Sequence, residues 1–318
     1  MAETIDFSAY NPAWPLIFDH EAQSIQGALQ GACLAIHHVG STAVPGLAAK
    51  PTIDIIAVIR PLAEVRCALE HSGYAFRGEY NIPFRGMYTK RCPHDINLPI
   101  NLHVYPEGHP EIALNILFRD CLRTNGETRA AYGALKATLA QAHDAAIKSE
   151  GAMFCSYTLG KDVFITGVLD AVGFSLPRFM RVTSPREWDA YHAIFKSQIF
   201  DPLGLIYDTA HPSFSAPNNH RFVWCRGSLV VSGVHVEKIS QSVAALRGLA
   251  THGEHQRQGY GRQLMGQVET WLKQQGIGVV KLHARPSAVP FYEGLGYGPM
   301  VFDDPSIQWH PVDMGKVL

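Results

Sequence analysis

Residues Leu246–Gly261 read LRGLATHGEHQRQGYG, and this stretch decides the fold of its half of the chain. An apolar run over residues 244–251 predicts a strand, and apolar residues at every fourth position from Tyr260 to Leu272 predict a helix with one hydrophobic side. A turn between a strand and a helix start collects main-chain N–H groups that have no partner in the helix. Because the helix dipole also favours negative charge there, the stretch predicts an anion site.

Two glycines allow a ligand to come close to this turn. Gly259 and Gly261 carry no Cβ, so a phosphate group can approach the main chain. Arg257 and Arg262 flank the turn and could add positive charge. A plainer interpretation, a turn that merely begins a helix, also fits the spacing, because two glycines two positions apart occur in many loops.

A second segment gives the turn its context. A strand is predicted over residues 279–284, and it is followed by Ala288–Tyr297, which reads AVPFYEGLGY. Together the two segments resemble the GNAT acetyltransferase superfamily, in which an Arg/Gln-x-x-Gly-x-Gly/Ala loop precedes a Phe-Tyr-Glu-x-Leu-Gly segment. The resemblance implies a GNAT acyl-CoA N-acyltransferase fold, acetyl-CoA as co-substrate and an amine of a small molecule or peptide as acceptor. It assigns the cofactor contacts to Leu249, Ala250, Thr251, Gln256, Arg257, Gln258, Gly259, Tyr260, Gly261 and Arg262.

The resemblance also suggests how protons would move. Tyr292, in the Phe-Tyr-Glu segment, would protonate the departing CoA thiolate, unless its ring serves for packing. An alkyl ammonium must lose a proton before it attacks a thioester, so a general base is needed. A main-chain N–H near residues 249–251 would stabilise the oxyanion. The candidate bases, which no spacing separates, are Glu237, His252, Glu254 and His283.

Composition narrows the class of protein. The 318 residues suggest two domains, which we place at residues 1–177 and 178–318. With 47% hydrophobic and 17% charged residues, each half can bury a core. The net charge of -1, without a basic run, does not favour nucleic acid as a partner. The six cysteines form no close pairs, which argues against a disulfide framework or a zinc site and for a cytoplasmic location.

Expectations for membranes and assembly follow from the same composition. The N-terminus is acidic and lacks an apolar core, so we expect no signal peptide. No apolar run is near the ~20 residues that a membrane span needs, so we expect no membrane contact. We expect a monomer or a homodimer.

A single carboxylate marks the first half of the chain. Strands are predicted over residues 33–39 and 52–59 with the loop 40–51 between them, and Asp54 is the charged residue of the second strand. A buried carboxylate is costly unless a metal, a cation or hydrogen bonds compensate it. Two interpretations stay open: a ligand site, or a carboxylate that accepts main-chain N–H groups from the Gly40–Ser41 turn.

The segment His38–Asp54, HVGSTAVPGLAAKPTID, resembles the GrpB family, and further matches extend over residues 6–175. The resemblance implies a nucleotidyltransferase-like mixed sheet with helices, so the whole chain is expected to be α/β (α+β). Enzymes of that fold bind divalent metals with paired aspartates, but Thr52 stands at the first aspartate position, which counts against a magnesium site. The residues that the resemblance assigns to a nucleotide, with or without Mg, are Gly40, Ser41, Lys50, Asp54 and His103.

Three functions stay open at this point. The first is an N-acetyltransferase, the second a nucleotidyltransferase centred on Asp54, and the third a sensor that binds CoA and a nucleotide without turnover. Basic residues of the first half could contact phosphate or could be ordinary surface charges. They are Arg119, Arg123, Lys136 and Lys161.

Local signals predict several further elements. Residues 173–180 predict a linker, and Ser184–Glu187 predict a capping box at a helix start. Residues 201–220 are rich in Pro, Asp, Asn and His, and they predict an irregular connection. The resemblance to GNAT proteins implies that this region helps to shape the acceptor site. Alternation over residues 306–317 predicts a final strand.

Overall fold

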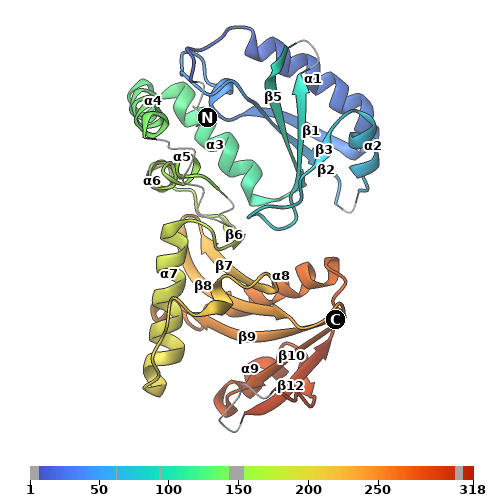
Figure 1. Cartoon of the computed structure of the whole chain (residues 1–318), viewed down its shortest axis with the longest axis vertical. Coiled ribbons are helices and arrows are strands. Elements are labelled where there is room, and N and C mark those ends of the chain that lie inside the picture. The colour runs from blue at the N-terminus through green and yellow to red at the C-terminus, as the bar shows by residue number, and fades with distance from the viewer. Residues whose placement is uncertain (1–6, 62, 93–94, 143–153, 305–310) are drawn as a thin grey trace. The chain divides into compact units, whose positions relative to one another are not determined.

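The computed structural model describes residues 7–61, 63–92, 95–142, 154–304 and 311–318. The chain divides into two compact units, Met1–Leu176 and Pro177–Leu318. Each unit contains one mixed sheet with helices packed against it (Figure 1), which confirms the predicted α/β class.

The sheet of the first unit has five strands in the order β1-β2-β5-β4-β3. β2 and β5 run parallel, and the other neighbours are antiparallel. Every residue of β2 except Asp54 is buried, as expected of a strand covered on both faces. The strands are β1 (Cys33–Val39), β2 (Ile53–Ile59), β3 (Ala75–Phe76), β4 (Gly86–Cys92) and β5 (Asp95–Pro106).

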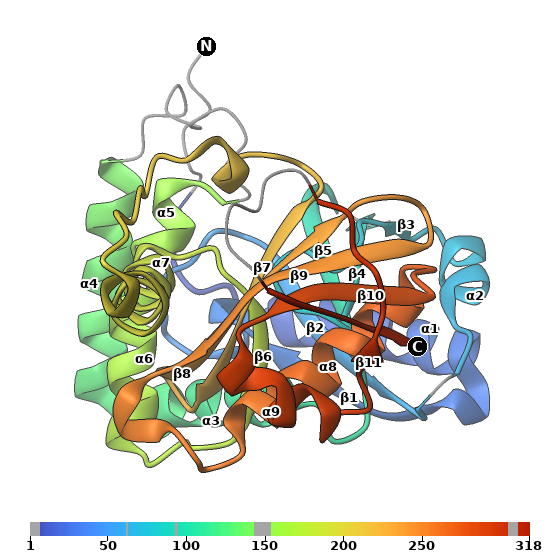
Figure 2. The same cartoon turned by 90° about the horizontal axis from the view of Figure 1, so that it is seen from below.

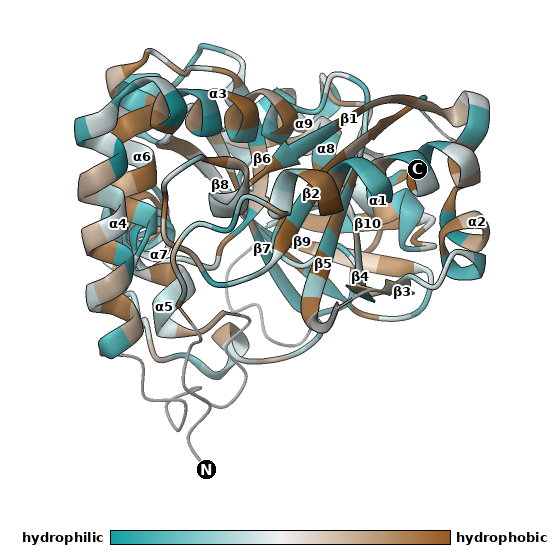
Figure 3. Ribbon diagram, turned by 90° about the horizontal axis from the view of Figure 1, so that it is seen from above, coloured by the Kyte–Doolittle hydropathy of each residue, from teal (hydrophilic) through white to brown (hydrophobic). Residues whose placement is uncertain are grey.

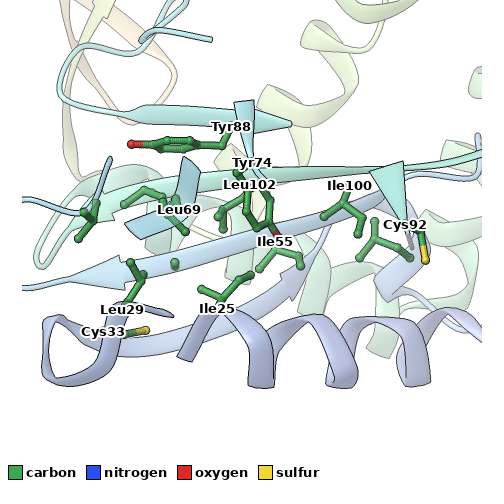
Figure 4. Packing of buried hydrophobic residues seen from close by; sticks show 14 of the residues in the cluster. Ile25, Leu29, Cys33, Ile55, Leu69, Tyr74, Tyr88, Cys92, Ile100 and Leu102 are labelled. Carbon is green, nitrogen blue, oxygen red and sulfur yellow. The ribbon is translucent and has the colours of Figure 1, made fainter. Parts of the chain in front are cut away.

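Helices cover both faces of this sheet. On one face, α1 (Trp14–Leu29) and α2 (Arg66–His71) pack on β2 and β5, and Figure 4 shows Ile25 of α1 beside Ile55 of β2. On the other face, Ile56 of β2 belongs to a separate cluster, because successive side chains of a strand point to opposite faces.

The remaining helices of the first unit have one hydrophobic and one hydrophilic side. Figure 3 shows this as an alternation of brown and teal along α3 and α4. Such helices bury one stripe and leave the opposite one in water. The elements are η1 (Gln30–Ala32), η2 (Ser41–Ala43), α3 (Pro110–Thr124), α4 (Gly126–Gln141), α5 (Ser156–Leu159) and α6 (Asp162–Ala171).

The sheet of the second unit has seven strands in the order β11-β12-β10-β9-β8-β7-β6. β9 and β10 run parallel, and the other neighbours are antiparallel. The strands are β6 (Pro177–Arg181), β7 (Asn219–Arg226), β8 (Leu229–Lys238), β9 (Val243–Thr251), β10 (Val279–Ala284), β11 (Gly298–Pro299) and β12 (Val312–Val317).

Two long helices lie on opposite sides of this second sheet (Figure 2). Rings of Tyr191 and Phe195 in α7 occupy the space where Gly233 of β8 would carry a Cβ, so α7 packs close to the strand. From the other side, Trp271 of α8 contacts Phe222 of β7, with ring centroids 4.8 Å apart. The elements are α7 (Pro185–Phe195), the π-helical turn η3 (Lys196–Phe200), η4 (Asp201–Leu203), η5 (Pro212–Phe214), η6 (Gly253–His255), α8 (Tyr260–Gln274), η7 (Pro286–Ala288) and α9 (Val289–Glu293).

Most local signals are confirmed, and one is wrong in part. Ser184 and Glu187 form both bonds of a capping box. Residues 177–180, predicted as linker, belong to β6, which pairs with β7. β12 confirms the end of the predicted final strand, and the rest of that prediction, residues 305–310, lies outside the described residues. In the part of the chain that the structure describes, no helix combines the length and the apolar character that a bilayer crossing requires.

Candidate functional site

Two neighbouring strands of the second unit separate where the cofactor is expected. β9 pairs with β10 from Val243 to Leu246, and the described pairing ends there. β9 continues to Thr251 beside β8, so its other edge carries main-chain groups without a strand partner. A strand edge of this kind can accept an extended ligand. The predicted residues Leu249–Thr251 belong to this part of β9, and alternate residues there direct their main-chain groups to the open edge.

A β-bulge lies at the same point. The pairing of β8 with β9 shifts its register after His235, so Arg247 is an extra residue on β9. Bulges commonly re-aim side chains next to active sites. Arg247 forms ion pairs with Glu237, at 2.7 Å, and with Asp304. The bulge therefore directs a guanidinium to a pair of carboxylates where the strands separate.

His283 extends this charged group onto β10. Its Nδ1 lies 2.9 Å from Oδ1 of Asp313, and its Nε2 lies 3.9 Å from Oδ2 of Asp304. Among the described residues, Nε2 is buried without a hydrogen-bond partner. When Nδ1–H donates to Asp313, Nε2 carries the lone pair. The separation cluster, as we call this group, consists of Glu237, Arg247, His283, Asp304 and Asp313.

The turn before α8 leaves main-chain donors open. Gly259 precedes the helix with a φ of +84°, in the left-handed region that favours glycine, and Arg257 also has a positive φ, of 61°. The N–H of Gln263 donates to the carbonyl of Gly259. In the part of the chain that the structure describes, no N–H from Arg257 to Arg262 has an acceptor. These donors lie where the sequence predicts an anion site.

The packing of the protein does not itself require a glycine at position 261. A Cβ on Gly261 would meet Phe291 and Thr251 at 3.5 Å, which is ordinary van der Waals contact. The missing side chain therefore leaves the main chain of Gly261 uncovered beside Phe291 and Thr251.

The side chains of this turn hold the turn itself. Gln256 donates to Gln198 of η3 at 2.8 Å. Arg262 donates to the carbonyl of Gly294 at 2.7 Å, so its guanidinium is already engaged. Arg257 is exposed. The contact between the two glutamines joins residues 58 positions apart, and sequence reasoning missed Gln198 because no local pattern marks it.

The four candidate bases lie in two parts of the second unit, the separation cluster and the turn after β9. Glu237 and His283 belong to the separation cluster. His252 and Glu254 lie at the turn after β9, where Nδ1 of His252 accepts the N–H of Glu254 and caps η6. Gln258 donates to the carbonyl of Glu254 at 3.2 Å. The structure thus gives His252 and Glu254 roles in the turn.

Tyr292 is a buried residue of α9, with 9% of its surface exposed. Its ring meets that of Tyr297 edge to face, with centroids 5.7 Å apart. Burial raises the pKa of the Tyr292 hydroxyl to about 12, although the charge of Arg285 acts in the opposite direction. The hydroxyl therefore keeps its proton at neutral pH, as a general acid must.

In the first unit, Asp54 lies between a glycine and an amide. Its Oδ1 accepts a hydrogen bond from Nδ2 of Asn101 on β5, at 2.9 Å. A Cβ on Gly40, whose φ is +71°, would overlap Oδ2. Burial raises the pKa of Asp54, and the hydrogen bond from Asn101 opposes that rise. Sequence reasoning missed Asn101, although its spacing from His103 in an apolar strand places both on one face.

His103 is not joined to Asp54. Its Nδ1 lies 3.4 Å from Nη1 of Arg85. Burial, together with that guanidinium, lowers the pKa of His103 to about 3, so the ring is neutral at neutral pH. Within the described ranges, no three His, Cys, Asp or Glu side chains gather in a way that could hold a metal ion.

Three basic side chains of α3 and α4 fix the chain that follows β1. Each donates a hydrogen bond to a main-chain carbonyl, so none is a plain surface charge. The bonds run from Arg119 to His38 at 2.9 Å, from Arg123 to Ala43 at 2.9 Å and from Lys136 to Ala48 at 2.6 Å. Lys161 differs, since its ammonium lies 4.6 Å from the centre of the Tyr157 ring. Sequence reasoning treated the four alike.

Two family models match the chain. A model described as GrpB protein matches residues 4–171, and a model described as acetyltransferase (GNAT) family matches residues 185–297. The first match contains Asp54 and the loop before it, and the second contains the separation of β9 and β10, the turn before α8 and Tyr292.

Curated relatives and a solved structure are similar to part of the chain. A UPF0157 protein of Halalkalibacterium halodurans is 40% identical over 141 residues, which are 43% of this chain and 70% of that protein. The UPF0157 protein YqkA of Bacillus subtilis is 32% identical over 168 residues, 51% of this chain and 45% of YqkA, so this chain spans less than half of that relative. A crystal structure of conserved protein GrpB from Enterococcus faecalis is 34% identical, with a TM-score of 0.44, and the match covers 51% of this chain and 94% of that one.

Proposed function

Because the chain belongs to the GrpB family through residues 4–171 and carries a GNAT acetyltransferase domain at residues 185–297, we propose that its second unit transfers an acetyl group from acetyl-CoA to an amine of a small molecule or a peptide. The chain is an enzyme of the N-acetyltransferase class, and the use of an acyl-CoA and of an amine acceptor follows from the GNAT domain.

The observation that carries the proposal is the set of open donors around Gly259. The N–H groups from Arg257 to Arg262 have no acceptor in the described part of the chain, and they lie at the positive end of the α8 dipole. A diphosphate supplies both the negative charge and the acceptor oxygens that such donors need. The diphosphate of a CoA carrier therefore fits this turn.

The open edge of β9 would hold the arm that joins the diphosphate to the thioester. Amide groups of that arm can pair with the main chain at Leu249–Thr251, as an added strand pairs with a sheet edge. Such pairing would bring the thioester near Arg247, where β9 and β10 separate. A main-chain N–H of the same stretch would stabilise the oxyanion that forms on the carbonyl.

Protons would move between two groups. The amine nitrogen attacks the thioester carbon and forms the C–N bond, and collapse of the tetrahedral intermediate breaks the C–S bond. Glu237, whose side chain is 25% exposed within the separation cluster, would take the ammonium proton directly or through a water molecule. Tyr292 would return a proton to the CoA sulfur. His283 would position the cluster through its contacts with Asp304 and Asp313, and His252 stays an alternative base.

The test uses the binding of acetyl-CoA to the full-length protein. A ligand at about 100 times its Kd stabilises the folded state by about 2.7 kcal/mol, which a thermal shift detects. Gly261→Asp adds a negative charge at the start of α8, close to the open donors, and should abolish the shift by repelling the diphosphate. Gly266→Asp is the matched control in the same helix, because nothing lies within 4 Å of a Cβ there. Gly259→Glu is a poorer choice, since a φ of +84° strains any side chain. A full shift in Gly261→Asp would contradict the proposed turn.

A further inference from the structure

The separated ends of β9 and β10 are connected through a third element. The described pairing of the two strands stops after Leu246, and η3, the π-helical turn that follows α7 directly, bonds to the chain beyond both of them. We infer that η3 fixes the spacing of the two strand ends, and that Gln198 in η3 is a positioning residue for the turn before α8. The inference rests on the proposed function, because it concerns the site proposed for acetyl-CoA.

On the β9 side, η3 meets the chain through a side-chain amide. Nε2 of Gln256 donates to Oε1 of Gln198 at 2.8 Å, and it lies 3.4 Å from the carbonyl oxygen of Thr251, the last residue of β9. Nε2 of Gln198 donates in turn to Oγ of Ser197 at 3.2 Å. A Cβ on Gly253 would meet the same Nε2 at 3.5 Å. Gln256 is therefore held between the end of β9 and η3.

On the β10 side, η3 is held by its main chain. Arg285 directly follows β10, and its Nη2 donates to the carbonyl of Ile199 at 2.8 Å. Gln198 and Ile199 are neighbours in sequence, so adjacent residues of one turn bond to the chain that leaves each strand. β9 and β10 run parallel, and the chain leaves both strands at the same edge of the sheet. The spacing of the strand ends thus depends on this one turn.

Close packing fixes η3 against β9. A Cβ at Gly248 would lie 2.8 Å from Cε1 of Phe195 and 3.5 Å from Cδ1 of Ile199. The first distance is shorter than a real Cβ contact allows, so glycine at this position lets α7 and η3 approach the strand. Phe195 is buried, and Ile199 packs against the same hydrophobic cluster. Gly248 lies beyond Leu246, in the part of β9 that β10 has left.

The form of η3 is itself unusual. α-Helices rarely continue into a π-helical turn, and such turns are frequent at functional sites. Lys196 and Asp201 form an ion pair across this turn at 2.8 Å, but both side chains are about half exposed, so the pair adds little stability. The contacts with β9, Gln256 and Arg285 are the better supported reason for the turn to keep its position.

Gln198 would act on the cofactor through Gln256 and not by contact with it. Gln256 directly precedes the open N–H groups of residues 257–262, so its side chain helps to hold those donors in place. Donors that are already in position bind an anion more tightly than mobile ones, because less freedom is lost on binding. Loss of the bond to Gln198 should therefore appear in the affinity for acetyl-CoA and not in the rate of transfer at saturation.

The experiment measures the affinity of the full-length protein for acetyl-CoA by calorimetry, and kcat for acetyl transfer across a panel of amines. Gln198→Met keeps the length of the side chain and removes the acceptor of the Gln256 amide. Kd and KM for acetyl-CoA should rise roughly 5-fold, while kcat stays within about two-fold of the parental value. Gln274→Met, at an exposed glutamine of α8, is the matched control and should change neither quantity.

Two further variants test the route of the effect. In a Gln256→Met background, Gln198→Met should cause no additional loss of affinity, because the bond between the two side chains is already absent. Arg285→Met removes the bond on the β10 side and should weaken acetyl-CoA binding at least ~5-fold. Affinity is the readout for this variant, since burial raises the pKa of Tyr292 and the charge of Arg285 opposes that rise.

The outcomes distinguish this inference from the proposed function. Parental affinity in Gln198→Met, or an equal further loss in the Gln256→Met background, would overturn the role of Gln198 while acetyl-CoA binding by the parent still supports the proposed function. A lower kcat at unchanged affinity would overturn it as well. Parental affinity in Arg285→Met would show that η3 does not fix the spacing. A parent that binds no acetyl-CoA would contradict both the inference and the proposed function.

Discussion

The turn after β1 and the turn after β9 are both held in place by side chains, yet the state of the main-chain groups differs between them. In the second unit, Gln256 and Arg262 hold the turn, and the main-chain N–H groups stay open. In the first unit, basic side chains of α3 and α4 hold main-chain carbonyls. There the three basic side chains are engaged with the main chain of their own unit.

The difference teaches how each site responds to substitution and to solution conditions. Main-chain donors have fixed positions, carry no titrating proton and survive most changes of side chain. Lysine ammonium groups are flexible point charges that titrate and that salt screens. We therefore expect the second unit to be vulnerable at its glycines, and the first unit to be vulnerable at single basic residues and to pH.

The largest expected effect tests whether acetyl transfer takes place in the second unit. Tyr292→Phe keeps the ring and removes the acid, so kcat for acetyl transfer should fall roughly 10²- to 10⁴-fold while the KM for acetyl-CoA changes little. Release of CoA is measured across a panel of amines. Tyr80→Phe, a tyrosine of the first unit that is 38% exposed, is the matched control. A variant at Tyr292 that keeps the parental kcat would show that its ring merely packs.

The next largest effect comes from removing a hydrogen bond that holds the chain beside the turn after β1. Arg119, whose side chain is 13% exposed, donates to the carbonyl of His38. Arg119→Met leaves that carbonyl without its partner, so the free energy of unfolding of the first unit should fall by about 2 kcal/mol. Chemical denaturation measures the loss, and acetyl-CoA affinity should stay unchanged. Arg66→Met, at a side chain that is 61% exposed, should cost less than about 0.5 kcal/mol. Equal losses of unfolding free energy in Arg119→Met and Arg66→Met would show that the bond from Arg119 to His38 does not stabilise the first unit.

The smallest effect, counted for one pH unit, is the dependence of the free energy of unfolding on pH. Burial lowers the pKa of Lys136 from 10.5 to about 7. Between those values the unfolded chain binds one more proton than the folded chain, so the free energy of unfolding should rise with pH by about 1.4 kcal/mol per unit from pH 7 to pH 10. Below pH 7 this slope disappears. Lys136→Met should lack the slope that parent protein shows in denaturation from pH 7 to pH 10. Identical slopes would mean that Lys136 stays charged when folded.

Local rules made much of the fold predictable. The capping box of α7 depends on residues three positions apart, and β1 and β10 follow from apolar runs with clear ends. β4 (Gly86–Cys92) was not predicted, because GMYTKRC alternates poorly and takes its strand form from pairing with β5. Residues 177–180 of β6 were mistaken for a linker for the same reason, since the pairing with β7 is a contact that no local pattern encodes.

The candidate sites show the same limit. Motif spacing located the turn before α8, because the turn and the helix that follows it are local. It did not reveal that Asn101 is the partner of Asp54, 47 positions away, or that Arg119 bonds to a carbonyl 81 positions away. Burial decided these cases, since a buried carbonyl or carboxylate takes whatever donor the fold brings near it.

A substitution of Gly40 should depend on an earlier substitution of Asp54. A Cβ at position 40 would overlap the carboxylate, and the positive φ adds strain for any other residue. A substitution at Gly40 should therefore be tolerated better once a smaller residue stands at position 54. In a library that randomises both positions, folded survivors without Gly40 should come from the fraction that has lost Asp54. The missing Cβ of Gly40 thus determines the order in which substitutions at positions 40 and 54 can accumulate.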